Sequence, residues 1–149
     1  MEVRIAELKD ADFLYETLKQ VNKVHTDIRP DLFGEKLTKY DKNQVKELIE
    51  NEKYLIFIAE EDSELYGYII CYTEDFYGKK TMYIDDLCVN NTKRHSGAGR
   101  ALYKYVKDYS KRQGCYNVTL HVWNGNDGAE NFYKEMGLKP LYTCMEEIL

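Results

Sequence analysis

The sequence predicts an α/β fold in which helices pack against a mixed, mostly antiparallel sheet. Three segments rich in β-forming residues, 54–59, 66–72 and 81–89, follow one another and are separated by turn residues, which indicates an antiparallel meander. After residue 98, helical and strand patterns alternate, and a strand–helix–strand unit of this kind is usually parallel. The 149 residues fit one domain, residues 1–149, with a core of ordinary size.

The segments before the meander predict a strand and two helices. Residues 3–8 alternate between apolar and polar types, as expected of a half-buried strand. Asp10 precedes apolar residues at helical spacing, so we expect it to cap a helix that extends to about Val24. Residues 25–40 contain Pro and Gly and are expected to form mostly loop, and Asp41 is the expected cap of a second, short helix.

The segments after the meander predict two more helices and further strands. Apolar residues recur at three- and four-residue steps through 98–109 and again through 129–136, which is typical of amphipathic helices. Between them, the pattern of residues 117–123 predicts a strand. Residues 141–148 offer one or two last strands, so the second half reads strand–helix–strand–helix–strand.

The composition excludes several classes of partner. Lys and Arg number 21 against 26 Asp and Glu, so the net charge of −5 gives no general attraction to nucleic acid or to an anionic membrane. The apolar runs are much shorter than the ~20 residues that a membrane-spanning helix needs, and the first residues lack the pattern of a secretory signal. The four widely spaced cysteines predict free thiols, so we expect a cytoplasmic protein without a disulfide framework or a metal site.

A glycine-containing segment between the last strand of the meander and the next helix is a candidate anion site. It reads Arg94-His95-Ser96-Gly97-Ala98-Gly99 and is followed by Arg100. Glycine lets the backbone turn tightly, and the free N–H groups at the start of a helix attract phosphate. A P-loop would continue with Lys and then Ser or Thr, and a dinucleotide fingerprint would need glycine where Leu102 stands. A glycine turn without any ligand is the plain alternative.

A second segment, from Asn126 to Tyr133, opens the last predicted helix. Together the two segments resemble the GNAT superfamily of N-acetyltransferases over nearly the whole chain. The acetyl-coenzyme A motif of that superfamily, Arg/Gln-x-x-Gly-x-Gly/Ala, is matched by Arg94, Gly97 and Gly99, and its Asn-x-x-Ala-x-x-Phe/Tyr-Tyr pattern by Asn126, Ala129, Phe132 and Tyr133. The resemblance implies a sheet of six to seven strands, in which the fourth and fifth strands splay apart, and about four helices.

In this superfamily acetyl-coenzyme A (acetyl-CoA) lies between the splayed fourth and fifth strands. The resemblance implies that backbone groups of Leu87 and Val89, on either side of Cys88, pair with the pantetheine arm. It implies also that Asn126 hydrogen-bonds the pantetheine. The pyrophosphate would lie on the amides of Arg94, His95, Ser96, Gly97, Ala98 and Gly99, next to Arg100.

The resemblance also implies the chemistry, in which a neutral amine attacks the thioester directly. Tyr133 matches the tyrosine that lies beside the thioester sulfur, and a phenol is protonated at pH 7, so Tyr133 is the expected general acid. Asp85 matches the acid that helps to deprotonate the amine through water. Strand alternation predicts that Asp85 and Asp86 lie on opposite faces of the sheet. From the residues alone, the alternatives are a packed aromatic at Tyr133 and a structural pair of carboxylates.

The function that we expect is an N-acetyltransferase that moves an acetyl group from acetyl-CoA to a primary amine of a small molecule, a polyamine or a protein. The alternatives are a non-catalytic sensor of coenzyme A on the same fold, and a nucleotide-binding module that uses the glycine segment. Small members of the superfamily often form homodimers through their C-terminal strands. Residues 141–149 are that region here, and their apolar side chains suit either a sheet edge or a dimer interface.

Overall fold

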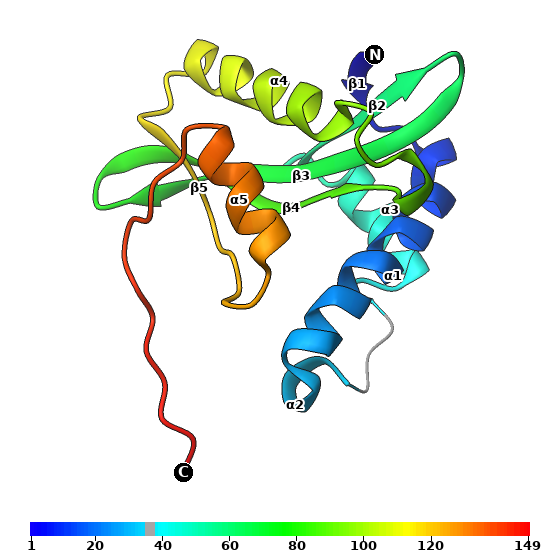
Figure 1. Cartoon of the computed structure of the whole chain (residues 1–149). Coiled ribbons are helices and arrows are strands. Elements are labelled where there is room, and N and C mark those ends of the chain that lie inside the picture. Colours follow the sequence, from blue (N-terminus) through cyan, green and yellow to red (C-terminus); the bar gives the residue numbers. More distant parts are fainter. Residues whose placement is uncertain (35–37) are drawn as a thin grey trace.

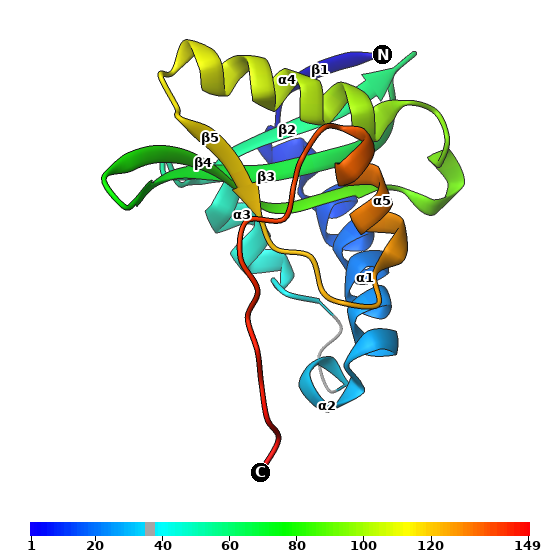
Figure 2. The same ribbon diagram turned by 60° about the vertical axis from the view of Figure 1, so that its left-hand side comes forward.

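The strands of the sheet lie side by side in the order in which they occur in the sequence (Figures 1 and 2). The computed structural model describes residues 1–34 and 38–149, and in this part of the chain the strands are β1 (Glu2–Ile5), β2 (Leu55–Glu61), β3 (Glu64–Phe76), β4 (Lys79–Val89) and β5 (Asn117–Leu120). The α-helices of the described residues are α1 (Ala11–Ile28), α2 (Pro30–Phe33), α3 (Lys42–Glu50), α4 (Ala98–Arg112) and α5 (Asp127–Glu135). Neighbouring strands are antiparallel except for β4 and β5, which are parallel. The predicted α/β fold with a mixed sheet is confirmed.

Helices cover both faces of the sheet. On one face α1 and α3 pack over Ile58, Tyr68 and Ile70, and on the other face α4 packs over Phe57 and Ile69 (Figure 1). Successive residues of a strand point to opposite faces, so each central strand contributes to both cores and reads as an almost continuous apolar run. None of the described helices has the length and the apolar character of a membrane span.

One difference from the sequence prediction lies before the meander. The expected loop over residues 25–40 overlaps α1, which extends to Ile28, and includes α2, so the prediction of loop is wrong for these residues. Pro30 is the first residue of α2, where its missing N–H removes no helical hydrogen bond, and it therefore starts a helix. Residues 35–37 of the expected loop lie outside the described part of the chain.

A second difference lies at the end of the sheet, which has fewer strands than the six to seven implied by the resemblance. β5 ends at Leu120, so the strand predicted over 117–123 is shorter than expected. Residues 141–148 form neither a helix nor a strand, and the prediction of strands there is wrong for the single chain. A strand needs a partner for its backbone groups, and residues 139–149 make no backbone hydrogen bond to the rest of the described chain.

The pairing of β4 with β5 stops halfway along β4. It runs from Thr81 opposite Asn117 to Ile84 opposite Leu120, and β4 continues to Val89 with no partner on this edge among the described strands. Beyond this point β4 and the segment that follows β5 run apart (Figure 2). The predicted splay of the fourth and fifth strands is confirmed.

β4 carries one extra residue at the same point. On the neighbouring strand β3, Cys71 pairs with Ile84 and the adjacent Ile70 pairs with Asp86, which leaves Asp85 unopposed as a β-bulge. A bulge bends its strand and shifts the alternation of the side chains that follow. The end of the parallel pairing and the bulge therefore coincide in the middle of β4.

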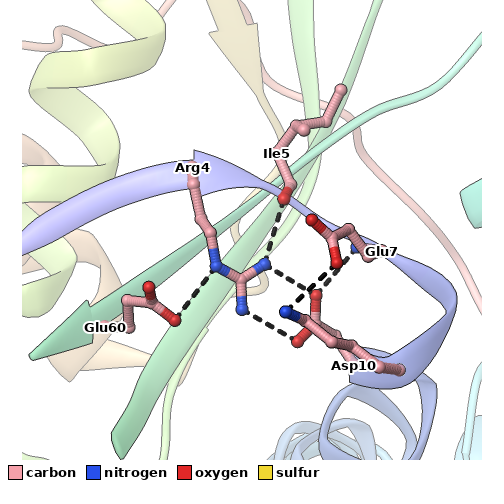
Figure 3. Close-up of polar contacts among 6 residues, drawn as sticks. Arg4, Ile5, Glu7, Asp10 and Glu60 are labelled. Atoms are coloured by element: carbon pink, nitrogen blue, oxygen red, sulfur yellow. Dashed lines mark hydrogen bonds and ion pairs between the residues drawn. The ribbon is translucent and has the colours of Figure 1, made fainter. Parts of the chain in front are cut away.

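The carboxylate of Asp10 ties β1 to the start of α1 (Figure 3). It accepts two hydrogen bonds from the guanidinium of Arg4, at 2.8 and 3.0 Å, and one from the backbone N–H of Glu7, at 2.8 Å. The Nε atom of Arg4 also forms an ion pair with the carboxylate of Glu60 on β2, at 3.0 Å. Asp10 precedes α1 as expected, but its side chain does not cap that helix, because the charged guanidinium is the stronger donor. The prediction of a side-chain cap is wrong here.

We predict that Asp10→Asn lowers the free energy of unfolding at pH 7 by ~1.5–3 kcal/mol, the usual loss for hydrogen bonds to a charged group. Burial alone would raise the pKa of Asp10, but the hydrogen bonds from Arg4 and Glu7 outweigh burial and hold this pKa below its ordinary value. The carboxylate therefore stabilises the fold above the unfolded pKa of ~3.9 and loses this effect as pH falls below it. Urea unfolding at pH 7 and at pH 3 measures the difference.

The matched control for Asp10→Asn is Glu16→Gln, which removes an exposed pair with Lys19 on α1. An exposed ion pair contributes little, so this change should cost no more than ~0.5 kcal/mol. Equal losses in the two variants, or a loss for Asp10→Asn that is the same at both pH values, would contradict the role of the Arg4–Asp10 pair.

Candidate active site

A cavity of about 430 Å³ opens where β4 and β5 separate. Its walls come from α1, α2, the bulge of β4, the residues after β5 and the start of α5. Residues that the sequence singled out line this one cavity together: Asp85, Asp86, Leu87, Asn126 and Tyr133. The fold thus brings residues that are far apart in the sequence to a single concave site.

The two adjacent carboxylates of β4 have partners on the same side of the sheet. Asp85 accepts a hydrogen bond from the ammonium of Lys39 at 2.7 Å and another from the hydroxyl of Tyr40 at 2.8 Å. Asp86 accepts one from the hydroxyl of Tyr68 at 2.6 Å; Tyr68 belongs to the core beneath α1 and α3, and Tyr40 packs against that core. The expectation that Asp85 and Asp86 lie on opposite faces of the sheet is wrong, because the bulge interrupts the alternation of side chains along β4.

The environment of Asp86 perturbs the pKa of its carboxyl group. Burial raises its pKa to about 6, although the hydrogen bond from Tyr68 and the charge of Lys39 oppose this effect. The negative charge of the neighbouring Asp85 adds to the rise. A carboxyl group with this pKa is ionised at neutral pH and accepts a proton more readily than an ordinary aspartate.

Tyr133 lies on α5 with its ring against Phe132 and Tyr103, at centroid distances of 5.1 and 6.5 Å. Burial, followed by the charge of Asp86, raises its pKa well above that of an exposed tyrosine. Its hydroxyl has no hydrogen-bond partner among the described residues, and the side chain faces the cavity. Tyr133 is therefore a protonated donor that a ligand in the cavity can reach.

The glycine segment forms the turn that the sequence predicts. Gly97 has φ 88° and precedes α4, a left-handed conformation that glycine adopts without strain. The N–H of Ala98 donates a hydrogen bond to the hydroxyl of Ser96. Arg94 and Arg100 are exposed on the same segment. His95 is also exposed and has a positive φ of 62°. The turn thus presents a helix N-terminus and basic side chains to solvent.

Gly99 joins the two sequence motifs in space. A Cβ atom at this position would lie 3.4 Å from the ring of Phe132 on α5 and 3.5 Å from a methyl group of Val89 on β4. These are ordinary van der Waals distances, so they show only that the start of α4 lies beside the end of β4 and α5. The glycine turn, the unpaired end of β4 and the helix that carries Tyr133 consequently form one continuous surface.

The unpaired end of β4 contains the residues predicted to bind the pantetheine. Leu87 and Val89 pair with β3 on one edge, and the other edge meets no strand among the described residues. The thiol of Cys88 between them is buried, which raises its pKa to about 12 and makes it unreactive. The side-chain oxygen of Asn126 accepts a hydrogen bond from the N–H of Ala129 at 3.3 Å, which fixes this residue at the start of α5.

The groups that contact Asp85 were not predicted from the sequence. Lys39 and Tyr40 reach Asp85 from 45 or more positions away, and no local pattern reveals such a contact. Phe33 places its ring 5.2 Å from that of His25 and 5.6 Å from that of Trp123. These aromatic rings line the cavity, and burial together with the charge of Lys39 lowers the pKa of His25.

Comparison with solved structures defines the class of fold. The structure matches a point mutant of the BH1408 protein from Bacillus halodurans with a TM-score of 0.92, at 25% identity, over 100% of this chain and 99% of that one. It matches a ribosomal-protein-alanine N-acetyltransferase from Brucella melitensis with a TM-score of 0.76, at 14% identity, over the whole of both chains. The second likeness concerns the fold alone. The protein has the fold of the GNAT acetyltransferases.

Comparison of sequences then gives the family. Residues 18–138 match the model of the acetyltransferase (GNAT) family, and the chain belongs to that family. An uncharacterized N-acetyltransferase, YhfO, from Bacillus subtilis is 35% identical over 95 residues, which cover 62% of this chain and 64% of YhfO. The probable N-acetyltransferase san of Drosophila melanogaster is 24% identical over 127 residues, which cover 85% of this chain and 65% of san. Each match thus covers just under two thirds of the relative's own length.

We predict that the pKa of Asp86, measured by carboxyl carbon NMR, is about 6 and that Tyr68→Phe raises it further. The reason is that the Tyr68 hydroxyl stabilises the ionised form, whereas burial destabilises it. This pKa is higher in the folded than in the unfolded state, so the ionised group lowers the free energy of unfolding above pH 6. This cost decreases, and stability rises, as pH falls from 6 towards the unfolded value of ~3.9.

The matched control is Tyr40→Phe, which removes a hydrogen bond to Asp85 and leaves the Tyr68–Asp86 bond in place. It should move the pKa of Asp86 less than Tyr68→Phe does. A wild-type pKa near that of an ordinary aspartate would show that Asp86 is not held in the environment described here.

Proposed function

We propose that the protein is an N-acetyltransferase that moves an acetyl group from acetyl-CoA to a primary amine by direct attack. The observation that carries this proposal is that two carboxylates, Asp85 and Asp86, and the unpaired hydroxyl of Tyr133 face one cavity where β4 and β5 part. A proton acceptor and a proton donor on one site are what transfer from a thioester to an amine requires. The GNAT family generally uses acetyl-CoA, which agrees with this chemistry.

The surface next to the cavity supports a donor with an extended arm and phosphate groups. The free edge of Leu87 to Val89 offers backbone groups to an amide-containing arm in the manner of an added strand. Asn126 stands at the cavity end of this edge. At its other end Gly99 packs against Val89, and the exposed turn from Arg94 to Arg100 suits a pyrophosphate.

In the proposed reaction the nitrogen of the neutral amine attacks the carbonyl carbon of the thioester. A new C–N bond forms and the C–S bond breaks. The proton of the amine passes to a carboxylate of β4, directly or through water. Tyr133 gives its hydroxyl proton to the leaving sulfur and regains a proton from solvent. The high pKa of Tyr133 supports this role, since its hydroxyl stays protonated until the thiolate forms.

Two residues are candidates for the proton acceptor. Asp85 is the residue that matches the position in the superfamily, and its contact with the Lys39 ammonium supports a role in holding a cationic amine. Asp86 is deeper and has the raised pKa that suits a general base near neutral pH. We propose that Asp85 binds the ammonium of the acceptor in place of Lys39 and that one of the two acids receives its proton.

The class of acceptor that this cavity supports is a primary alkyl amine that arrives as a cation, on a small molecule, a polyamine or a protein. The ion pair between Asp85 and Lys39 supports a cation because the pair already places an alkylammonium group at the cavity. The cysteines of the described residues are free thiols, in keeping with a reducing cytoplasmic compartment, which we also propose. The alternative of a non-catalytic sensor predicts acetyl-CoA binding without turnover.

We predict that Tyr133→Phe lowers kcat by at least about 10²-fold while acetyl-CoA binds with nearly unchanged Kd, because only the donated proton is lost. Release of free thiol, followed with a chromogenic disulfide, measures kcat, and calorimetry measures Kd. The control is Tyr103→Phe, since Tyr103 is the buried tyrosine beside Tyr133 and lies outside the cavity lining. Unchanged turnover in Tyr133→Phe would remove Tyr133 from the mechanism.

We predict that kcat/KM of the wild type falls as pH drops below about 6 if Asp86 is the base, because the protonated carboxyl cannot accept a proton. Asp86→Asn should then remove this acidic limb and lower kcat, and Asp85→Asn should mainly raise KM for cationic acceptors. The opposite pattern, with the acidic limb lost in Asp85→Asn alone, would assign the base to Asp85.

A further inference from the structure

Lys39 places the nitrogen of a primary alkyl amine inside the cavity. Its ammonium lies 2.7 Å from the carboxylate of Asp85, and of the lysines in the described part of the chain it alone lines the cavity. The function proposed above assigns this position beside Asp85 to the ammonium of the acceptor. The chain therefore holds a group with the chemistry of an acceptor at the place where an acceptor would bind.

The residues that follow Lys39 fix its position. Tyr40 packs against the core beneath α1 and α3, and its hydroxyl donates a hydrogen bond to Asp85 at 2.8 Å. Asp41 caps α3, because its carboxylate accepts a hydrogen bond from the N–H of Gln44 at 2.8 Å. The ammonium of Lys39 also lies 5.5 Å from the centre of the Tyr40 ring. The nitrogen is thus held at the cavity by its neighbours in the chain as well as by Asp85.

The proton acceptors and the proton donor of the site surround this nitrogen. The side chain of Lys39 is 51% exposed, whereas that of Asp85 is only 10% exposed, so the ammonium reaches from the solvent side towards buried acids. Burial raises the pKa of Asp86, and the positive charge of Lys39 opposes this rise. Tyr133 lines the same cavity. The groups that would acetylate a bound amine are therefore shared with a lysine of the chain itself.

We propose that the protein acetylates its own Lys39 when acetyl-CoA is bound and no free acceptor is present. This proposal rests on the function proposed above. The ammonium gives a proton to one of the two acids of β4, and the neutral Nζ attacks the carbonyl carbon of the thioester. The C–N bond forms, the C–S bond breaks, and Tyr133 protonates the leaving sulfur. Of the two protons that the nitrogen loses, one replaces the proton given by Tyr133 and the other goes to solvent.

Lys9 distinguishes a directed reaction from chemical acetylation by acetyl-CoA in solution. It is also paired with a carboxylate, that of Glu7 at 3.1 Å, but its side chain is 66% exposed and does not line the cavity. Chemical acetylation follows exposure, so it would modify Lys9 at least as fast as Lys39. A cavity that holds the amine beside the thioester raises its effective concentration, so the directed reaction modifies Lys39 faster.

The first experiment incubates the wild-type chain with acetyl-CoA in a buffer without amines. Lysines that remain free are then capped with deuterated acetic anhydride under denaturing conditions, and peptide mass spectrometry gives the fraction of each lysine that had gained a light acetyl group. We expect Lys39 to react at least about tenfold faster than Lys9, with a first-order rate that is independent of protein concentration. Free thiol should appear as a burst of about one equivalent per chain.

Three variants test whether this reaction uses the site. Tyr133→Phe should slow the acetylation of Lys39 to the rate of Lys9 and leave Lys9 unchanged, because only a reaction in the cavity uses the hydroxyl of Tyr133. The matched control Tyr103→Phe should keep the preference for Lys39, since Tyr103 lies outside the cavity lining. Lys39→Arg keeps the positive charge but removes the amine, so the burst of thiol should disappear.

A second readout does not depend on turnover. Acetylation converts the ammonium of Lys39 into a neutral amide. The positive charge that opposes the raised pKa of Asp86 is then lost, so this pKa should rise further in the acetylated chain. Carboxyl carbon NMR of the wild type before and after acetylation measures the change. An unchanged pKa of Asp86 in a chain acetylated at Lys39 would overturn the placement of this lysine in the site.

The outcomes separate this proposal from the proposed function. A preference for Lys39 that depends on Tyr133 supports self-acetylation. A rate at Lys39 no greater than that at Lys9, or a first-order rate constant that rises with protein concentration, overturns it. If free amines are acetylated and Lys39 is not, self-acetylation is wrong and the proposed function stands. If acetyl-CoA binds and neither a free amine nor Lys39 gains an acetyl group, both are wrong.

Discussion

The break in pairing between β4 and β5 after Ile84 is the constraint on which the site depends. While two parallel strands are bonded, their facing edges are satisfied and no ligand can enter between them. Beyond Ile84 the edge of β4 is free, and the bulge at Asp85 turns two neighbouring carboxylates to the same side of the sheet. α5 follows β5 across the opening and carries Tyr133 into it. The two carboxylates and Tyr133 are thus placed by the end of the β4–β5 pairing and by the bulge and helix next to it.

Much of the fold could be predicted because it follows from local patterns. The β-forming residues of 54–59, 66–72 and 81–89, with turn residues between them, and the helical spacing through 98–109 identify their elements without knowledge of the tertiary structure. The motif residue Gly97 could be found because it answers a geometric need, since it adopts a positive φ that glycine takes without strain.

The rest could not be predicted because it depends on contacts that local sequence does not encode. Strict alternation separates Asp85 from Asp86, and only the register with β3 reveals the bulge that reunites them. Lys39, Tyr40 and Tyr68 bind these acids from distant elements, and the buried environment that raises the pKa of Asp86 exists only in the assembled core. The strand pattern of 141–148 is unmatched in the single chain because a strand depends on a partner.

The measurement that tests the central claim most directly is the release of thiol from acetyl-CoA across a panel of amines, with hydrolysis in the absence of acceptor as the blank. The panel should contain polyamines, amino acids, aminoglycosides and peptides with free N-termini, together with neutral amides of matched size. The account predicts release that depends on a primary amine and favours those that carry a positive charge. Saturable binding of acetyl-CoA without release for any amine would contradict catalysis and favour a sensor. Absence of binding would contradict the assignment of the surface from Leu87 to Arg100.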